Sequence, residues 1–125
     1  MAKPFLFLLL CSFAATAAPK RVLYITHSAG FRHDSLPTSC AIMQDIGVRS
    51  GAFDVVCSED LALISADSLR DFDILYFFTS GELALSDQQK ADMLAFVRDG
   101  KGFGGAHSAT DTLYTWPEYG ELIGA

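Results

Sequence analysis

The sequence of 125 residues is poor in basic side chains and in cysteine, and it has no repeats or low-complexity runs. Nine Lys and Arg residues stand against fifteen Asp and Glu, so the formal net charge is −6. A charge of this sign argues against nucleic acid and against anionic membrane surfaces as partners. None of the three cysteines stands in a C-x-x-C pair or another thiolate metal spacing, which argues against a cysteine-based metal site.

Two motifs that are common in α/β enzymes are also lacking. Gly100, Gly102 and Gly105 match G-x-G-x-x-G by letter, but a dinucleotide fingerprint follows a strand and opens a helix. Here a helical pattern precedes the glycines and a strand-like run lies among them, which argues against a nucleotide site. The nucleophile elbow G-x-S-x-G is absent as well, because the positions that flank Ser108 are not glycines.

A long apolar run is confined to the N-terminus. Lys3 precedes apolar residues 5–13, and the small-x-small sequence A-T-A follows at 15–17, which is the layout of a secretory signal peptide. The run is too short to span a bilayer as a helix. We therefore expect residues 1–17 to be a signal peptide, and the mature chain to be exported to the periplasm or the cell exterior without membrane attachment. The alternatives are an N-terminal anchor, a lipoprotein at Cys11 or an ordinary buried segment.

Two cysteines, Cys40 and Cys57, would remain after cleavage. An exported protein can pair them. They lie on separate predicted elements, however, and two small buried thiols fit the sequence at least as well. The sequence leaves their pairing open.

Strand and helix patterns alternate along residues 21–125, which we expect to form one domain. Apolar, β-branched or aromatic runs predict four strands. They span residues 21–26, 53–57, 73–79 and 101–106. Apolar residues at helical spacing, such as Ile42, Met43 and Ile46, predict helices between the strands. These are expected at 35–51, with Ser35 as N-cap; at 67–71, as a short helix or turn; at 86–100, with a capping box of Ser86 and Gln89; and from 116 onwards. The alternation predicts an α/β fold, a flavodoxin-like three-layer sandwich with a parallel sheet ordered 2-1-3-4.

Polar loops follow the first, third and fourth predicted strands. Sheets of this type bind ligands outside the carboxyl ends of their strands, near the switch point. All three histidines fall at this edge of the sheet. The candidate side chains in the loops are His27, His33, Ser80, Glu82, His107, Ser108 and Asp111.

Three blocks of sequence carry a family resemblance. They read T-H-S-A-G-F-R-H at 26–33, F-T-S-G-E at 78–82 and G-F-G-G-A-H-S-A-T-D-T at 102–112, and W-P-E-Y follows at 116–119. In this order they make the chain resemble the ThuA-like (trehalose utilisation) family, whose fold is similar to that of class I glutamine amidotransferases. Such domains usually continue further, so we expect an N-terminal part of the domain. Its uncovered apolar faces are expected to favour self-association, and a homo-oligomer stays open.

The resemblance implies a link to disaccharide or keto-sugar metabolism, with a small-molecule carbohydrate as the ligand. The amidotransferase relatives carry a cysteine nucleophile at the elbow where His107 stands, so thiolate-dependent amidotransfer is disfavoured. Two classes of function remain. The first is an exported carbohydrate-active enzyme that uses histidine and glutamate acid–base chemistry. The second is a non-catalytic carbohydrate-binding module of the same fold.

We expect His107, Glu82 and Asp111 to be the catalytic residues. The imidazole would transfer protons, Glu82 would act as acid or base, and Asp111 would orient the imidazole. Each has a simpler interpretation: a histidine that braces its loop, a charge that complements the next helix, and an Asx turn.

Substrate contacts are expected from six further side chains. These are His27, Arg32, His33, Ser80, Ser108 and Trp116. Tyr114 and Trp116 suggest a sugar-stacking wall, with ordinary packing as the alternative. No cofactor is predicted. The alternative is zinc held by His27, His33 and His107, although these come from different loops and show no ligand spacing.

Overall fold

The computed structural model describes residues 17–125, so the predicted signal peptide lies outside the described residues except for Ala17. Strands and helices alternate as the sequence predicts. In chain order they are β1 (Lys20–Ile25), α1 (Leu36–Ser50), β2 (Phe53–Ser58), the 3₁₀ turn η1 (Leu61–Leu63), α2 (Ala66–Leu69), β3 (Ile74–Phe77), α3 (Asp87–Arg98), β4 (Gly102–Gly105), the 3₁₀ turn η2 (His107–Thr110) and α4 (Pro117–Ile123). All strand pairs are parallel, and the order β2-β1-β3-β4 confirms the predicted topology.

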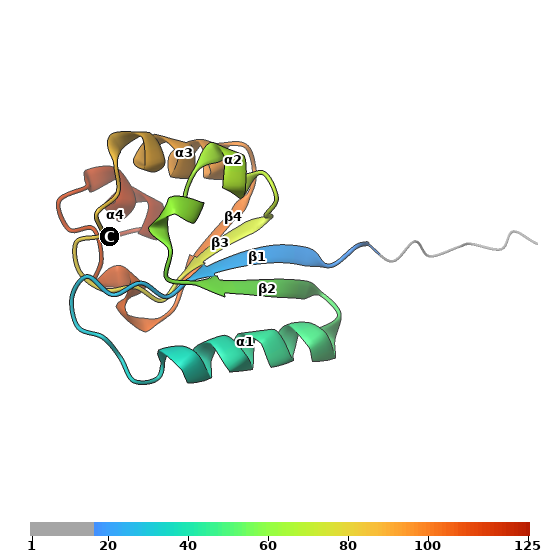
Figure 1. Cartoon of the computed structure of the whole chain (residues 1–125). Helices are drawn as coiled ribbons and strands as arrows, with labels where there is room; N and C mark the ends of the chain where they lie inside the picture. The colour runs from blue at the N-terminus through green and yellow to red at the C-terminus, as the bar shows by residue number, and fades with distance from the viewer. Residues whose placement is uncertain (1–16) are drawn as a thin grey trace, which may run out of the picture.

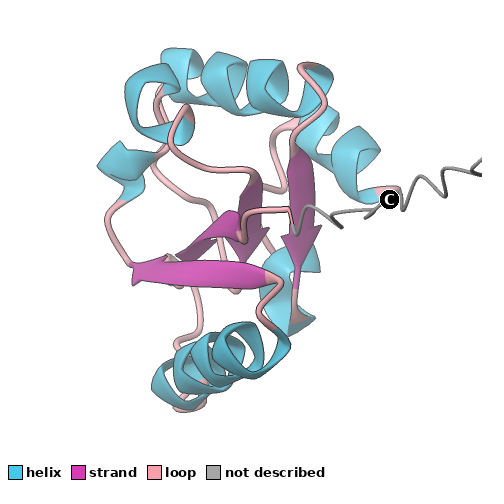
Figure 2. Cartoon of the chain, turned by 90° about the vertical axis from the view of Figure 1, so that its right-hand side faces the viewer, coloured by secondary structure: helices cyan, strands magenta, loops and turns pink. Residues whose placement is uncertain are grey.

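The sheet is the middle layer of three. Helix α1 covers one face near β2 and β1, whereas α2, α3 and α4 cover the other face (Figures 1 and 2). The larger apolar core lies between the sheet and these three helices, because Leu23, Ile25, Leu75 and Phe77 point to that side. A smaller cluster on the α1 side joins Tyr24, Leu36 and Phe78. Because β1, β3 and β4 are parallel, the polar loops that follow them share one edge of the sheet.

The signals at the helix ends are mostly confirmed. Ser86 and Gln89 form the predicted capping box of α3, and Gly51 ends α1 in the left-handed conformation with φ +64°. Ser35 stands at the predicted N-cap position of α1, but its hydroxyl forms no capping hydrogen bond within residues 17–125.

The apolar face expected for α1 is only partly buried. Met43 packs against the cluster of Tyr24, Leu36 and Phe78. Ile42 and Ile46 remain 52% and 39% exposed. The helix packs mainly on β2 at the margin of the sheet, so one narrow stripe of its surface is covered.

A disulfide answers the question that the sequence left open. Cys40 of α1 is bonded to Cys57 of β2, with their Cα atoms 6.2 Å apart. The bond fastens α1 to the edge strand β2. Among residues 17–125, no helix combines the length and the apolar character needed to cross a bilayer.

Candidate functional site

The loops after β1, β3 and β4 continue the parallel arrangement beyond the strands. Ser28 bridges to Ser80, and Gly81 bridges to Thr112. The Ser80 carbonyl accepts hydrogen bonds from the backbone N–H groups of Ala29 and Gly30 at 2.8 and 3.0 Å. Figure 1 shows the cyan loop after β1 and the orange turn after β4 at the same end of the sheet. The predicted meeting of these loops at the carboxyl edge is confirmed.

His107 stands at a sharp turn between β4 and η2. Its φ of +49° is one of two positive values among the non-glycine residues of the described chain. The turn is tight on both sides: Ala106 N–H donates to the Phe77 carbonyl, and a Cβ on Gly105 would lie 2.5 Å from the Ala109 Cβ. Left-handed residues of this kind cluster at active sites, where strain holds a side chain in place. His107 therefore occupies an elbow-like strand-to-helix turn and is exposed to solvent.

The ring of His107 contacts the ring of His33, which comes from the loop before α1. The His33 and His107 ring centroids are 4.5 Å apart, with the rings edge to face. Both rings pack on buried Phe78, at 5.6 and 5.7 Å. The ring of exposed Phe31 also contacts His33, with the ring centroids 4.9 Å apart. The structure thus brings two of the three predicted histidines together on an aromatic floor.

Phe31 is the residue that sequence reasoning missed. It lies inside the first block of the family resemblance, directly before Arg32 and His33, and that position was the available signal.

His27 and Arg32 lie at the edge of the site, and both are bonded to the same acidic residue, Glu59. The His27 Nδ1 atom is 2.9 Å from the Glu59 carbonyl oxygen, and Arg32 makes two hydrogen bonds of 2.7 and 2.8 Å to the Glu59 carboxylate. These bonds from Arg32 hold the pKa of the Glu59 carboxyl below its usual value. Arg32 is thereby linked to the residue that follows β2.

The zinc alternative finds no support in this arrangement. Within the described part of the chain, no group of three or more His, Cys, Asp or Glu side chains is close enough to hold a metal ion. His27 is engaged with Glu59, whereas His33 and His107 pair with each other.

Three of the predicted substrate contacts are buried. Ser80 donates through Oγ to the Phe31 carbonyl at 2.6 Å, so it braces the loop after β1. The Ser108 hydroxyl is buried and has no hydrogen-bond partner among the described residues. Trp116 is only 7% exposed, stacks on Tyr119 and lies beneath the Lys90 ammonium group. The packing alternative therefore describes Trp116, and no stacking wall forms with exposed Tyr114.

The two predicted catalytic carboxylates hold the segment that follows His107. Glu82 accepts a 2.8 Å hydrogen bond from the Thr115 hydroxyl, and Asp111 accepts one of 2.9 Å from the Tyr114 hydroxyl. This bond from the phenol to Asp111 raises the pKa of Tyr114. In the described residues, neither carboxylate is hydrogen-bonded to the His107 ring, so the expected orienting role of Asp111 lacks a direct contact.

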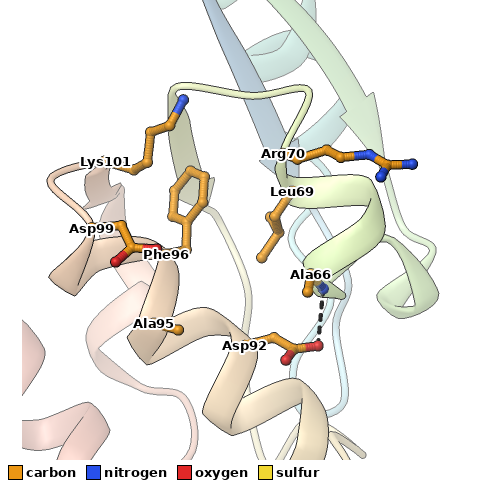
Figure 3. A pocket seen from close by; sticks show the side chains of 8 residues that line it. All are labelled: Ala66, Leu69, Arg70, Asp92, Ala95, Phe96, Asp99 and Lys101. Atoms are coloured by element: carbon orange, nitrogen blue, oxygen red, sulfur yellow. Dashed lines mark hydrogen bonds between the residues drawn. The ribbon is translucent and has the colours of Figure 1, made fainter.

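Two hollows differ in their relation to these residues. One of about 310 Å³ lies beside His107, between β4, η2 and the end of α4. A second, also about 310 Å³, lies between α2 and α3 (Figure 3). Leu69 and Phe96 line it, and Asp92 closes one end by accepting a hydrogen bond from Ala66 N–H. The second hollow contains none of the predicted site residues.

Comparison with known proteins decides the family. The model of the ThuA family, described as trehalose utilisation, matches residues 21–125. The chain belongs to the ThuA family. A search of the curated proteins gave no match.

Two solved structures share the ThuA fold. A ThuA-like protein from Parabacteroides merdae is 21% identical with a TM-score of 0.66, over 83% of this chain and 38% of that one. A ThuA-like protein from Bacteroides uniformis is 13% identical with a TM-score of 0.65, over 93% of this chain and 47% of that one. The chain thus spans less than half the length of either protein, and at these identities the likeness concerns the fold.

Proposed function

We propose that this ThuA-family chain carries a histidine-centred site for a sugar substrate, of the trehalose or keto-sugar type, in an exported enzyme. The observation that carries the proposal is the His107 turn. The backbone of His107 is left-handed at the end of a strand, and its imidazole is exposed to solvent. The centroid of this ring is 4.5 Å from that of a second imidazole, His33. The family description supplies the sugar, and the site supplies the chemistry.

Histidine suits proton transfer to and from hydroxyl groups, because it exchanges protons in the physiological pH range. In the proposed reaction, His107 takes or gives the proton at the reacting oxygen. His33 contacts the same ligand from the neighbouring loop. The hollow beside His107 leaves space for a ligand next to the glycine-rich end of β4.

The other predicted residues hold this arrangement in the proposal. Glu82 and Asp111 fix the segment after His107 through Thr115 and Tyr114. On the opposite side, His27 and Arg32 fasten the loop that carries His33 to Glu59, and Ser80 holds its backbone. Since the elbow residue is a histidine, the site offers no thiolate there for glutamine amidotransfer.

The decisive test is His107→Ala in the full-length protein, assayed for conversion of trehalose and of its keto derivative. Loss of a positioned acid or base lowers turnover by about 10²–10⁴-fold. We expect this loss without a change in melting temperature, because the side chain is exposed. The control is Val48→Ala, on the outer surface of α1 and 80% exposed, which should leave turnover unchanged.

The alternative function, a non-catalytic carbohydrate-binding module, predicts a different result. The wild-type protein would then bind sugar without turnover, and His107→Ala would weaken affinity alone. Full activity in His107→Ala would contradict both functions. We expect turnover to survive treatment with a chelator. If a chelator abolished turnover and zinc restored it, the reaction would depend on a metal ion and not on proton transfer by His107 alone.

A further inference from the structure

Phe31 is unusual for an exposed aromatic residue because it is held in place. Its ring is 72% exposed. Its carbonyl accepts the 2.6 Å hydrogen bond from Ser80 Oγ, and the preceding Gly30 N–H donates to the Ser80 carbonyl. The ring also rests edge to face on His33. An exposed apolar side chain is common on protein surfaces. Here, however, the backbone on both sides of the residue is hydrogen-bonded to Ser80, and the ring contacts the imidazole of His33.

The rings of Phe31 and His107 both contact the ring of His33 at the carboxyl edge. The ring centroids are 4.9 Å and 4.5 Å from that of His33, and both imidazoles contact buried Phe78. Phe31 offers a flat apolar ring, and the two histidines offer ring nitrogens that bond hydroxyls. A pyranose ring has the matching chemistry, with a C–H face and a rim of hydroxyl groups.

We propose that Phe31 is the stacking platform of the sugar site and so determines its affinity; this inference rests on the function proposed above. The platform is a single ring. Its sequence neighbour Arg32 is an exposed side chain that is ion-paired with Glu59, so charged groups flank the ring on this side. One sugar ring is the ligand that a platform of this size accommodates.

The inference predicts a graded series of affinities for trehalose, measured by calorimetry on the full chain. Phe31→Ala should weaken binding by about 3- to 10-fold, the usual value of one stacking contact. Phe31→Trp and Phe31→Tyr should bind like wild type, because they retain a flat ring. Phe31→Leu should fall between, since it keeps apolar surface without the flat face. The matched control Val48→Ala removes another exposed apolar side chain and should have no effect.

In the enzyme assay, Phe31→Ala should raise KM and leave kcat close to that of wild type, as expected for uniform binding energy. NMR of the His33 and His107 ring signals during the trehalose titration separates the two proposals. If the signals shift but Phe31→Ala binds as tightly as wild type, the platform is refuted and the histidine site stands. If trehalose leaves both signals unmoved, the proposed function fails, and the platform fails with it. If Phe31→Ala lowered the melting temperature as well as the affinity, the residue would be structural, and this result would also refute the platform.

Discussion

Gly81 and Gly30 lie in direct backbone contact where the loops after β3 and β1 cross. A Cβ on Gly81 would stand 2.8 Å from the Gly30 Cα, and Gly81 itself has φ +78°. Two separate demands thus fall on one residue: a left-handed backbone and no side chain. The contact sets the distance at which the loop carrying Phe31 and His33 is held to β3.

Gly81→Ala should therefore destabilise the protein more than an ordinary left-handed glycine would. We expect a loss of more than about 2 kcal/mol in the free energy of unfolding. The matched control is Gly51→Ala, which has φ +64° and open space around the new Cβ, and should lose about 1 kcal/mol. Urea unfolding of both variants measures the difference. Equal losses would show that the contact with Gly30 adds nothing to the conformational cost.

Removal of the disulfide by Cys40→Ala/Cys57→Ala should lower the free energy of unfolding by about 3 kcal/mol. The bond closes a loop with a sequence separation of 17 residues, and the lost restraint of the unfolded chain scales with that loop. Denaturant unfolding with and without a reducing agent provides the measurement. The reducing agent should destabilise the wild-type protein and leave the double variant unaffected; a wild type indifferent to reduction would contradict the prediction.

Asp73 should make stability depend on acid pH. Its carboxylate accepts hydrogen bonds from Arg21 N–H at 3.0 Å and Lys101 Nζ at 3.3 Å, and these hold its pKa below the usual value. A lowered pKa stabilises the folded chain above the unfolded pKa, and the contribution is lost as the pH falls through the folded pKa. Asp73→Asn should therefore have a lower free energy of unfolding than wild type near neutral pH. The two free energies should converge on acidification below about pH 4. Urea midpoints measured across this range test the sign, and a gap that widens in acid would disprove it.

Export predicts the N-terminus of the mature protein. If residues 1–17 are a cleaved signal peptide, N-terminal sequencing of protein from the source cell should begin near Ala18. The disulfide is consistent with this proposal, because such bonds persist in oxidising compartments. Recovery of mature protein that still begins with Met1 would reject it.

The sheet could be predicted from the sequence because each strand is a separate apolar run with helical spacing between runs. The edge with the polar loops followed from the topology, since the carboxyl ends of parallel strands share a side. Contacts between loop side chains could not be predicted in this way. The sequence placed His27, His33 and His107 at one edge of the sheet without showing which of them meet, and in the structure His27 contacts Glu59 while the other two pair over Phe78.

Burial within the loops was equally hidden from the sequence. Ser80, Ser108 and Trp116 read as accessible polar or amphipathic groups, but each turns inward. Their directions depend on backbone details such as the crossing of Gly30 and Gly81. The pairing of Cys40 with Cys57 likewise required the position of α1 over β2.

The disulfide and the His107 turn lie on opposite flanks of the sheet. We therefore expect the two flanks to differ in how easily they open locally. The β2 flank is covalently cross-linked to its helix, whereas the β4 flank is held by hydrogen bonds such as the one from the buried Tyr119 hydroxyl to the Ala109 carbonyl. Local opening costs least where buried apolar contacts are few and backbone hydrogen bonds are exposed to solvent, as at exposed His107, Thr110 and Asp111. Amide hydrogens around residues 106–112 should consequently exchange through smaller openings than those of β1 and β2. The cross-link thus steadies the β2 flank, whereas the turn that carries His107 depends on non-covalent contacts.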